Sequence, residues 1–422
     1  MVTKHLYYGW IMVALAIVVL MVIGIQSYSL SVLMKPMTQS LNVTRGELAL
    51  AITLPNIIAG LLSIFAGRLT DKYGPRFLVT VCGVCIFIGC LLLSRVNALW
   101  QIYAINFGPM LIGFACGYTP IMSNLSRWFG PRIRGMAIGI GTAGYAIGGA
   151  IGPPILQSLI SAYDWRQTYV ILGITFLVVL GIISQFMRHS PQRMGLRMPG
   201  EEIILTDRQP SLAATQHSNA GEGMSLIQAI KTLRFWILGA IAIIYSFSYW
   251  SIIAHLASYA TDAGVSAMVA ASIVSTIAIG SIAGKLLLGF IVVKAGVKKA
   301  VFGSFIMLAL PQLLLLFTTG TWTLYLFAAV FGFAYGGLMT LLNVAPGEFF
   351  GVKSVGTVLG VLIYFTVIGS AIGPPVFGYI FDTTQNYRNA FLIMMALAVV
   401  GVILSVLLLR LREKDKPLAK TE

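Results

Sequence analysis

The sequence predicts an all-α membrane protein in which twelve membrane-spanning helices form two similar six-helix bundles. Three observations predict this fold: the composition, twelve apolar stretches of spanning length, and motifs that repeat between the halves. Of the 422 residues 58% are hydrophobic and only 10% are charged, whereas soluble chains carry about 25% charge. A single aqueous core cannot hide so much apolar surface, so the chain's solvent is lipid. An aqueous enzyme, a disulfide-rich secreted scaffold and a disordered chain are excluded.

The apolar stretches are close to the roughly 20 residues that a helix needs to cross a bilayer. Backbone polar groups in lipid must be satisfied internally, which predicts helices and not isolated strands. The first stretch is too long for a signal-peptide core and further spans follow it, so we expect it to be retained. The twelve predicted spans are residues 9–33, 47–67, 77–94, 99–123, 135–158, 167–187, 235–260, 267–292, 299–318, 322–345, 355–380 and 389–410.

A polar segment from Arg188 to Gly223 separates the sixth span from the seventh. It contains Ser, Thr, Gln, Gly and Pro and lacks periodic apolar positions, a composition typical of flexible linkers. The predicted organisation is therefore a first bundle over residues 1–187, a cytoplasmic linker over 188–230, a second bundle over 231–410 and a cytoplasmic tail over 411–422.

The net charge of +15 does not indicate nucleic-acid binding, because the basic residues lie in short clusters between apolar stretches. With the N-terminus inside, 22 of the 28 lysines and arginines fall in cytoplasmic segments and five in outer ones. Membrane proteins keep basic loop residues in the cytoplasm. We therefore expect a multi-pass protein of the cell (inner) membrane with both termini cytoplasmic.

Several motifs recur at a nearly constant distance along the chain. Gly67 and Gly289 are 222 residues apart, as are Gly74 and Gly296, and two Gly-Pro-Pro motifs beginning at Gly152 and Gly373 are 221 apart. Such agreement indicates a duplicated six-helix unit, the parallel-repeat arrangement of carriers that work by alternating access. We expect close, sliding helix contacts at two glycine-rich faces. These faces are Gly144, Gly148 and Gly152, and Gly356, Gly360, Gly369 and Gly373.

The loop that follows the second span, Gly67-Arg-Leu-Thr-Asp-Lys-Tyr-Gly-Pro-Arg76, resembles the signature loop of the major facilitator superfamily. The resemblance covers essentially the whole chain and implies the major facilitator fold. A gating role is expected for Gly67, Asp71, Lys72, Gly74 and Arg76. The glycines permit close helix approach, and Asp71 can pair with a basic residue or a helix terminus in one transport state. The second copy has Val293 instead of the acid, so this latch is expected to be asymmetric. The alternative is a merely solvated turn.

Two further segments resemble the monocarboxylate transporters and the oxalate:formate antiporters. One is Tyr8-Gly-Trp10 with Gly24-Ile-Gln-Ser-Tyr28, and the other runs from Arg127-Trp-Phe129 to Ala143-Gly-Tyr145. This resemblance implies transport of a small organic anion. An exporter motif, Gly148-Gly-Ala-Ile-Gly-Pro153, suggests a drug/proton exporter instead, but exporters usually need a membrane acid.

Lys285 is a cation within the eighth span, while all thirteen acids lie at span ends, in the linker or in the tail. Nine residues separate it from Lys294, so it lies about 14 Å deep in a core about 30 Å thick. Without an internal acid its natural counter-ion is an anionic substrate. The alternative is a lysine that reaches the headgroups. Both resembled groups have an essential basic residue here, usually arginine; lysine offers a point charge where arginine offers a bidentate fork.

His255 is the one histidine within a predicted span, about 10 Å from its outer edge. A side-chain pKa near 6.5 suits a proton carrier, and some bacterial monocarboxylate carriers have a histidine on this span. The alternative is a hydrogen-bonded packing histidine. Lys285 itself is a second candidate for the coupled proton.

Aromatic hydroxyls within the spans are candidates for the substrate cavity. A phenol donates to a carboxylate while its ring lines an apolar wall. The resemblance implies that Tyr28, Tyr118, Tyr145 and Tyr335 lie where oxalate carriers have cavity aromatics. Simple packing is the alternative for each, and Asn124 is a weaker candidate.

The resembled antiporters have a second basic residue on the eleventh span, whereas this chain has Tyr364-Phe-Thr-Val-Ile-Gly369 there. One membrane cation favours a monoanion over oxalate. Inward movement of one negative charge costs about 2.3 kcal/mol per 100 mV, so a coupled proton is favourable. The predicted function is uptake of a lactate- or pyruvate-like monocarboxylate with a proton, and the alternatives are an oxalate/formate-type exchanger, the drug exporter and a non-transporting membrane sensor.

No enzymatic, metal or cofactor chemistry is predicted. Cys82 and Cys85 have C-x-x-C spacing, but like Cys90 and Cys116 they lie in lipid-like sequence, which indicates buried thiols. No nucleophile–base pair and no folded output domain is evident. We expect the protein to function as a monomer in the lipid bilayer, with the monocarboxylate and the proton as its small partners.

Overall fold

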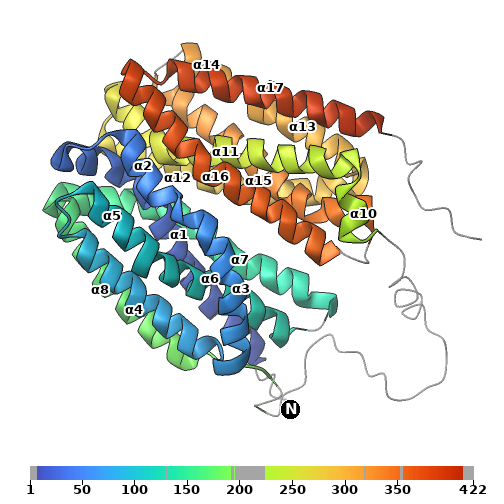
Figure 1. The fold of residues 1–422 in the computed structure, drawn as a ribbon, viewed down its shortest axis with the longest axis horizontal. Coiled ribbons are helices and arrows are strands. Elements are labelled where there is room, and N and C mark those ends of the chain that lie inside the picture. The colour runs from blue at the N-terminus through green and yellow to red at the C-terminus, as the bar shows by residue number, and fades with distance from the viewer. Residues whose placement is uncertain are drawn as a thin grey trace, which may run out of the picture. The chain divides into compact units, whose positions relative to one another are not determined.

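The fold was analysed in a computed structural model, which describes residues 7–129, 131–191, 194, 224–317, 320–351 and 355–411. Nearly all of these residues lie in helices (Figure 1). Ten helices of the described residues are long and apolar enough to cross a bilayer. The predicted all-α membrane fold is confirmed.

Each predicted span coincides with one helix or with helices in direct succession. The helices of residues 8–186 are α1 (Tyr8–Leu41), α2 (Arg45–Thr53), α3 (Pro55–Tyr73), α4 (Pro75–Leu93), α5 (Leu99–Ile105), η1 (Asn106–Met110), α6 (Leu111–Trp128), α7 (Pro131–Tyr163) and α8 (Trp165–Phe186). The helices of residues 226–410 are α10 (Leu226–Ile230), α11 (Leu233–Asp262), α12 (Ala267–Ala295), α13 (Val297–Ala309), α14 (Gln312–Phe317), α15 (Thr321–Phe350), α16 (Val355–Thr384) and α17 (Arg388–Arg410).

Three spans predicted as single helices are divided near a proline. Pro55 begins α3 directly after α2, Pro109 follows the non-helical Gly108 within η1, and Pro311 separates α13 from α14. Proline has no N–H group and clashes with the preceding turn, so it interrupts a helix. Leu54 and Leu310 keep helical backbone angles, whereas Gly108 marks a kink.

The repeat is visible in the backbone of two turns. Gly74 lies between α3 and α4 with φ 84° and ψ 165°, and Gly296 lies between α12 and α13 with φ 79° and ψ 156°. Positive φ is accessible to glycine without steric cost. The two glycines that are 222 residues apart therefore make the same turn, as the duplication predicts.

Close contacts do occur at the predicted glycine faces. A Cβ at Gly148 would meet the carbonyl oxygen of Met21, and one at Gly144 would meet that of Ile17, so α7 packs directly on the backbone of α1. In the second copy a Cβ at Gly369 would meet the Ile243 carbonyl of α11. Gly360 has no neighbour among the described residues within 4 Å of such a Cβ, and the surroundings of Gly356 lie outside the described residues.

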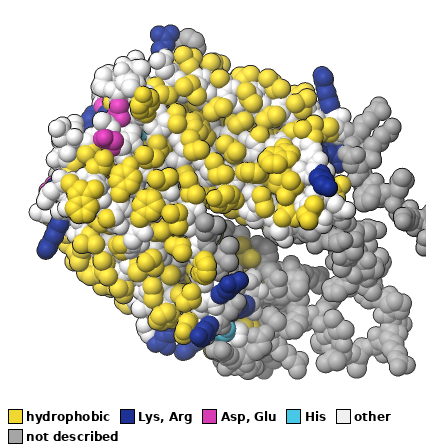
Figure 2. All heavy atoms as spheres, in the orientation of Figure 1, with side chains coloured by type: hydrophobic (Ala, Val, Ile, Leu, Met, Phe, Trp, Pro, Cys, Tyr) yellow, Lys and Arg dark blue, Asp and Glu magenta, His cyan; other side chains and the backbone are white. Residues whose placement is uncertain are grey.

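One face of α8 consists of exposed apolar side chains, as expected of a helix surface in contact with lipid. Ile174, Val178, Ile182 and Phe186 recur every four residues and are all exposed, which places them on one side of the helix. Figure 2 shows hydrophobic side chains over most of the visible face and charged side chains towards its margins. This distribution is that of a multi-pass membrane protein.

The chain packs as two compact units that do not follow the chain order strictly. Unit 1 contains residues 1–203, 252–278 and 374–385, and unit 2 contains residues 204–251, 279–373 and 386–422. Three helices, α11, α12 and α16, each contribute to both units. The bundle boundaries at residues 187 and 231 stay a prediction. Most of the predicted linker 188–230 and of the tail 411–422 lies outside the described residues, although α10 forms at the linker's end.

Candidate functional site

Lys285 lies on α12 beside a close contact with α15. A Cβ at the preceding Gly284 would meet the Phe333 carbonyl oxygen, and one at Gly336 would meet the Ser281 carbonyl, so the two helices touch over this stretch. The Lys285 side chain is half-buried. It has no hydrogen bond or ion pair with any residue that the structure describes. The predicted cation is therefore without a carboxylate partner in the described part of the chain.

Tyr335 belongs to an aromatic stack in unit 2. Its ring lies 3.3 Å from that of Tyr249 at an interplanar angle of 7°, and 5.4 Å from that of Tyr245. Tyr249 in turn stacks against Phe331. Tyr245 and Tyr249 were not among the predicted site residues; their four-residue spacing, which puts both on one face of α11, was the available signal.

Three predicted tyrosines lie on neighbouring helices of unit 1. The Tyr28 ring of α1 meets the Tyr145 ring of α7 edge to face, with centroids 6.3 Å apart. A Cβ at Gly149 would lie 2.5 Å from the Tyr28 ring, so that glycine leaves room for it. Tyr118 is half-buried on α6. A Cβ at the neighbouring Gly117 would meet the Ile23 side chain of α1, so the two helices are close here. The structure thus brings Tyr28 and Tyr145 into contact and puts Tyr118 on the adjoining helix.

His255 is buried in unit 1 and joins α11 to α16. Its Nε2 lies 2.8 Å from the Pro374 carbonyl oxygen, and its ring is 6.0 Å from that of Phe377. A carbonyl only accepts hydrogen bonds, so Nε2 carries the hydrogen. A hydrogen-bonded packing histidine was one of the two predicted readings, and the role of His255 in proton coupling stays a prediction.

The segment with the predicted gating role is mostly helical, because α3 continues to Tyr73 and α4 begins at Pro75. Gly74 supplies the turn, and Arg76 donates to the side chain of Gln185 on α8. Lys72 lies 5.1 Å from the centroid of the Tyr73 ring, and Gly67 packs near Thr119 of α6. The side chain of Asp71 lies outside the described residues, so its predicted pairing stays a prediction.

Asn124 is hydrogen-bonded to the segment that follows α8, while its Oδ1 has no hydrogen bond with the residues described. Its amide donates to the Arg188 carbonyl oxygen at 2.8 Å, and the Trp128 indole donates to the same carbonyl. The Tyr7 hydroxyl donates to the Trp128 carbonyl, and burial raises the pKa of Tyr7 to about 12. These bonds fix the chain after α8 to the ends of α1 and α6.

Charged residues that the sequence analysis assigned only to span ends form a cluster in unit 1. We call Lys35, Arg45, Asp262 and Asp382 the Arg45 cluster. One Asp262 oxygen lies 2.7 Å from Lys35 Nζ and the other 2.6 Å from an Arg45 guanidinium nitrogen. Asp382 accepts from the backbone N–H groups of Arg45 and Gly46 at 3.0 and 2.8 Å.

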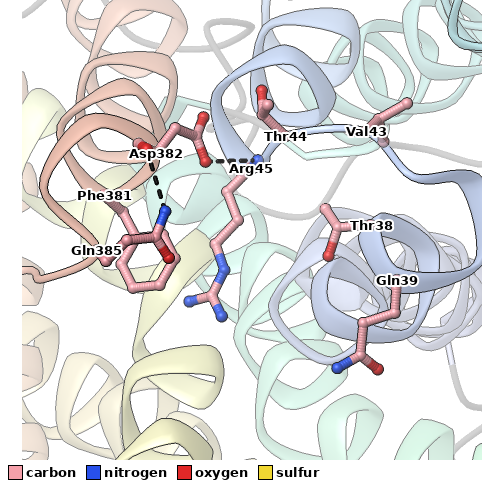
Figure 3. A pocket seen from close by; sticks show the side chains of 8 residues that line it. All are labelled: Thr38, Gln39, Val43, Thr44, Arg45, Phe381, Asp382 and Gln385. Carbon is pink, nitrogen blue, oxygen red and sulfur yellow. Dashed lines mark hydrogen bonds between the residues drawn. The ribbon is translucent and has the colours of Figure 1, made fainter.

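The Arg45 cluster borders a cavity of about 270 Å³. Figure 3 shows Asp382 directed to the Arg45 backbone and Phe381 beside the Arg45 side chain. The guanidinium lies 3.9 Å from the centroid of the Phe381 ring. Helices α1 and α2 are thereby tied to the end of α11 and to α16, at the end of unit 1 where α1 finishes.

Comparisons with known proteins agree with the predicted resemblance. The sequence profile of the Major Facilitator Superfamily matches residues 16–280 and 236–422. The chain is 25% identical over 353 residues to monocarboxylate transporter 12 of Mus musculus, covering 80% of this chain and 71% of that protein. It is 25% identical over 260 residues to the oxalate:formate antiporter of Oxalobacter formigenes, covering 61% and 57%.

A solved structure shares the fold over nearly its full length. It is a bacterial homolog of the human lysosomal transporter Spinster, in an inward-facing and occupied conformation. The TM-score is 0.73 at 16% sequence identity, with 98% of this chain and 99% of that chain covered. At this identity the likeness concerns the fold alone.

Proposed function

This chain belongs to the Major Facilitator Superfamily, and from that premise we propose that it carries a small monocarboxylate, lactate- or pyruvate-like, across the cell (inner) membrane together with a proton. It is a transporter related to the monocarboxylate transporters and the oxalate:formate antiporter. The observation that carries the proposal is Lys285, a half-buried membrane cation without a partner among the described residues.

An unpaired ammonium group in a membrane span can take a transported anion as its partner and release it again. An ammonium group in the hydrocarbon region costs about 2.5–3.5 kcal/mol on insertion scales, and a carboxylate of the chain would lower that cost permanently. A transported carboxylate lowers it only while bound. Lys285 therefore suits an anion that arrives and leaves, and the phenols of Tyr28, Tyr118, Tyr145 and Tyr335 would supply donors and apolar walls.

The coupled proton would be held by Lys285 or His255. His255 already donates to the Pro374 carbonyl, which favours Lys285. With a proton the cycle is electroneutral and escapes the cost of moving an anion against the membrane potential. We further propose that both termini are cytoplasmic, on the distribution of basic residues.

Exchange of oxalate and formate is the second candidate, because one relative is an oxalate:formate antiporter. The eleventh span has no charged side chain from Tyr364 to Gly369. A single membrane cation favours a monoanion over a dianion, so this candidate ranks second.

Uptake of radiolabelled lactate into proteoliposomes with an inward proton gradient tests the proposal. Lys285→Ala is expected to abolish uptake, and Lys285→Arg to preserve it, because the charge is retained. Oxalate and formate in the same assay distinguish the second candidate. Full lactate transport by Lys285→Ala would refute the role of this cation.

A further inference from the structure

A second polar cavity lies in unit 1, between α1, α7, α11 and the start of α12. Its volume is about 150 Å³. We call it the Ser31 pocket, and its polar side chains are Ser31, Lys35, Gln39, Gln157, Ser258 and Thr261. The lining begins at Ser31, about 4.5 Å along α1 from Tyr28, and includes neither Tyr28 nor Tyr145.

Two hydroxyls in this pocket lack partners. Ser31 is 1% exposed and Ser258 is 2% exposed, and neither Oγ has a hydrogen bond with the residues described. Other serines of the same helices, such as Ser27 and Ser248, donate back to the carbonyl four residues earlier. A buried hydroxyl without a partner is unfavourable, and it remains available to a ligand.

Lys35 adds a positive charge to the Ser31 pocket, and two of its three N–H donors have acceptors. Its Nζ lies 2.7 Å from Asp262 Oδ1 and 3.4 Å from the Thr261 hydroxyl. An ammonium has three N–H donors, so one remains. Asp262 also forms an ion pair with Arg45. Asp382, the other acid of the Arg45 cluster, accepts hydrogen bonds from backbone N–H groups of α2.

The composition of the pocket indicates the class of ligand. The two hydroxyls without partners, two carboxamides and an ammonium offer hydrogen-bond donors to an anion, and the ammonium repels a positively charged ligand. Val32, Pro36, Ala257 and Ala267 form the apolar part of the lining. A short aliphatic chain with one carboxylate matches both parts.

We propose that the Ser31 pocket is a second carboxylate-binding site, in which Lys35 exchanges Asp262 for the carboxylate of a small monoanion. This inference rests on the proposed transport of such an anion. Binding would remove one of the two cations from Asp262 and so weaken the Arg45 cluster, which ties α1 and α2 to α11 and α16. The anion would thus loosen the contact that closes this end of unit 1.

Protection of an introduced cysteine tests binding directly. In the full-length protein, Ser258→Cys is labelled with a membrane-impermeant methanethiosulfonate, and the unsubstituted protein gives the background of the four native cysteines. Sodium lactate is expected to slow labelling several-fold relative to sodium chloride. The protection is expected to persist with Lys285→Ala and to disappear with Lys35→Gln.

The outcomes separate this site from the proposed function. Protection that survives Lys285→Ala supports the second site whether or not Lys285 proves essential for transport. Equal labelling in lactate and chloride would overturn it, as would protection that depends on Lys285 and not on Lys35.

Transport kinetics distinguish binding by Lys35 from a merely structural ion pair. Lys35→Gln removes the cation and is expected to raise the KM for lactate, whereas Asp262→Asn frees Lys35 and is expected to lower it. Ser31→Ala is expected to raise KM by about 2- to 10-fold, because it removes one hydrogen bond to the anion. If Lys35→Gln and Asp262→Asn shift KM in the same direction, Lys35 serves only the ion pair and the proposal fails.

Discussion

Lys35 and Lys285 are both lysines on long apolar helices, yet their surroundings differ. Lys35 lies near the end of α1, 2.7 Å from Asp262. Lys285 lies within α12 and has no partner among the residues that the structure describes. A cation at a helix end can be paired with a fixed carboxylate and stabilise one arrangement of helices. An unpaired cation within a span is suited to an anion that binds and is released during transport.

Among the variants that test this difference between the two lysines, Lys285→Met is expected to have the largest effect. The change removes a membrane charge worth about 2.5–3.5 kcal/mol on insertion scales, so the substrate-free protein is expected to gain thermal stability while losing transport. Lys35→Met is the matched control and is expected to lower stability, because it takes a partner from Asp262. Thermal unfolding in detergent, read with lactate uptake, checks both. A destabilised Lys285→Met protein would mean that Lys285 has a permanent partner.

A smaller effect is expected from the two acids of the Arg45 cluster. Asp262→Asn weakens charge-assisted bonds to both Lys35 and Arg45, and we expect a loss of about 1–3 kcal/mol in the free energy of unfolding. Asp382→Asn affects only the first N–H groups of α2, where an anion is worth about 0.3–1 kcal/mol. Thermal unfolding at low and high salt measures both, and high salt is expected to reduce the differences. Equal losses for the two variants would contradict the assignment of Asp262 as the shared partner.

The spans and the repeated turn were predictable because their causes are local. Helix length follows from the thickness of the bilayer, and the turns at Gly74 and Gly296 follow from the one residue type that takes positive φ freely. The cation Lys285 was also visible, since a charge within a long apolar stretch needs no structure to be noticed. These signals lie within windows of about 20 residues.

The Arg45 cluster was not predictable, because its members come from distant segments. Asp382 bonds to Arg45 across 337 positions of the chain, and a single sequence assigns such an acid only to a span end. The stacking of Tyr335 on Tyr249 depends on the rotation of two helices about their axes, which hydropathy does not fix. The bond from Asn124 to the backbone of Arg188 also joins segments 64 positions apart, so it was not predictable for the same reason.

The smallest expected effect concerns His255, a buried polar group that is hydrogen-bonded to the backbone. His255→Gln keeps a donor that can reach the Pro374 carbonyl, so proton-driven lactate uptake and its pH profile are expected to change less than about twofold, within the value of one hydrogen bond. His255→Ala leaves that carbonyl without its donor and is expected to cost about 1–3 kcal/mol of stability. Uptake at several pH values, with unfolding of the same preparations, separates packing from coupling. If a stable His255→Gln protein loses the proton dependence, the histidine carries the proton and Lys285 binds the anion alone.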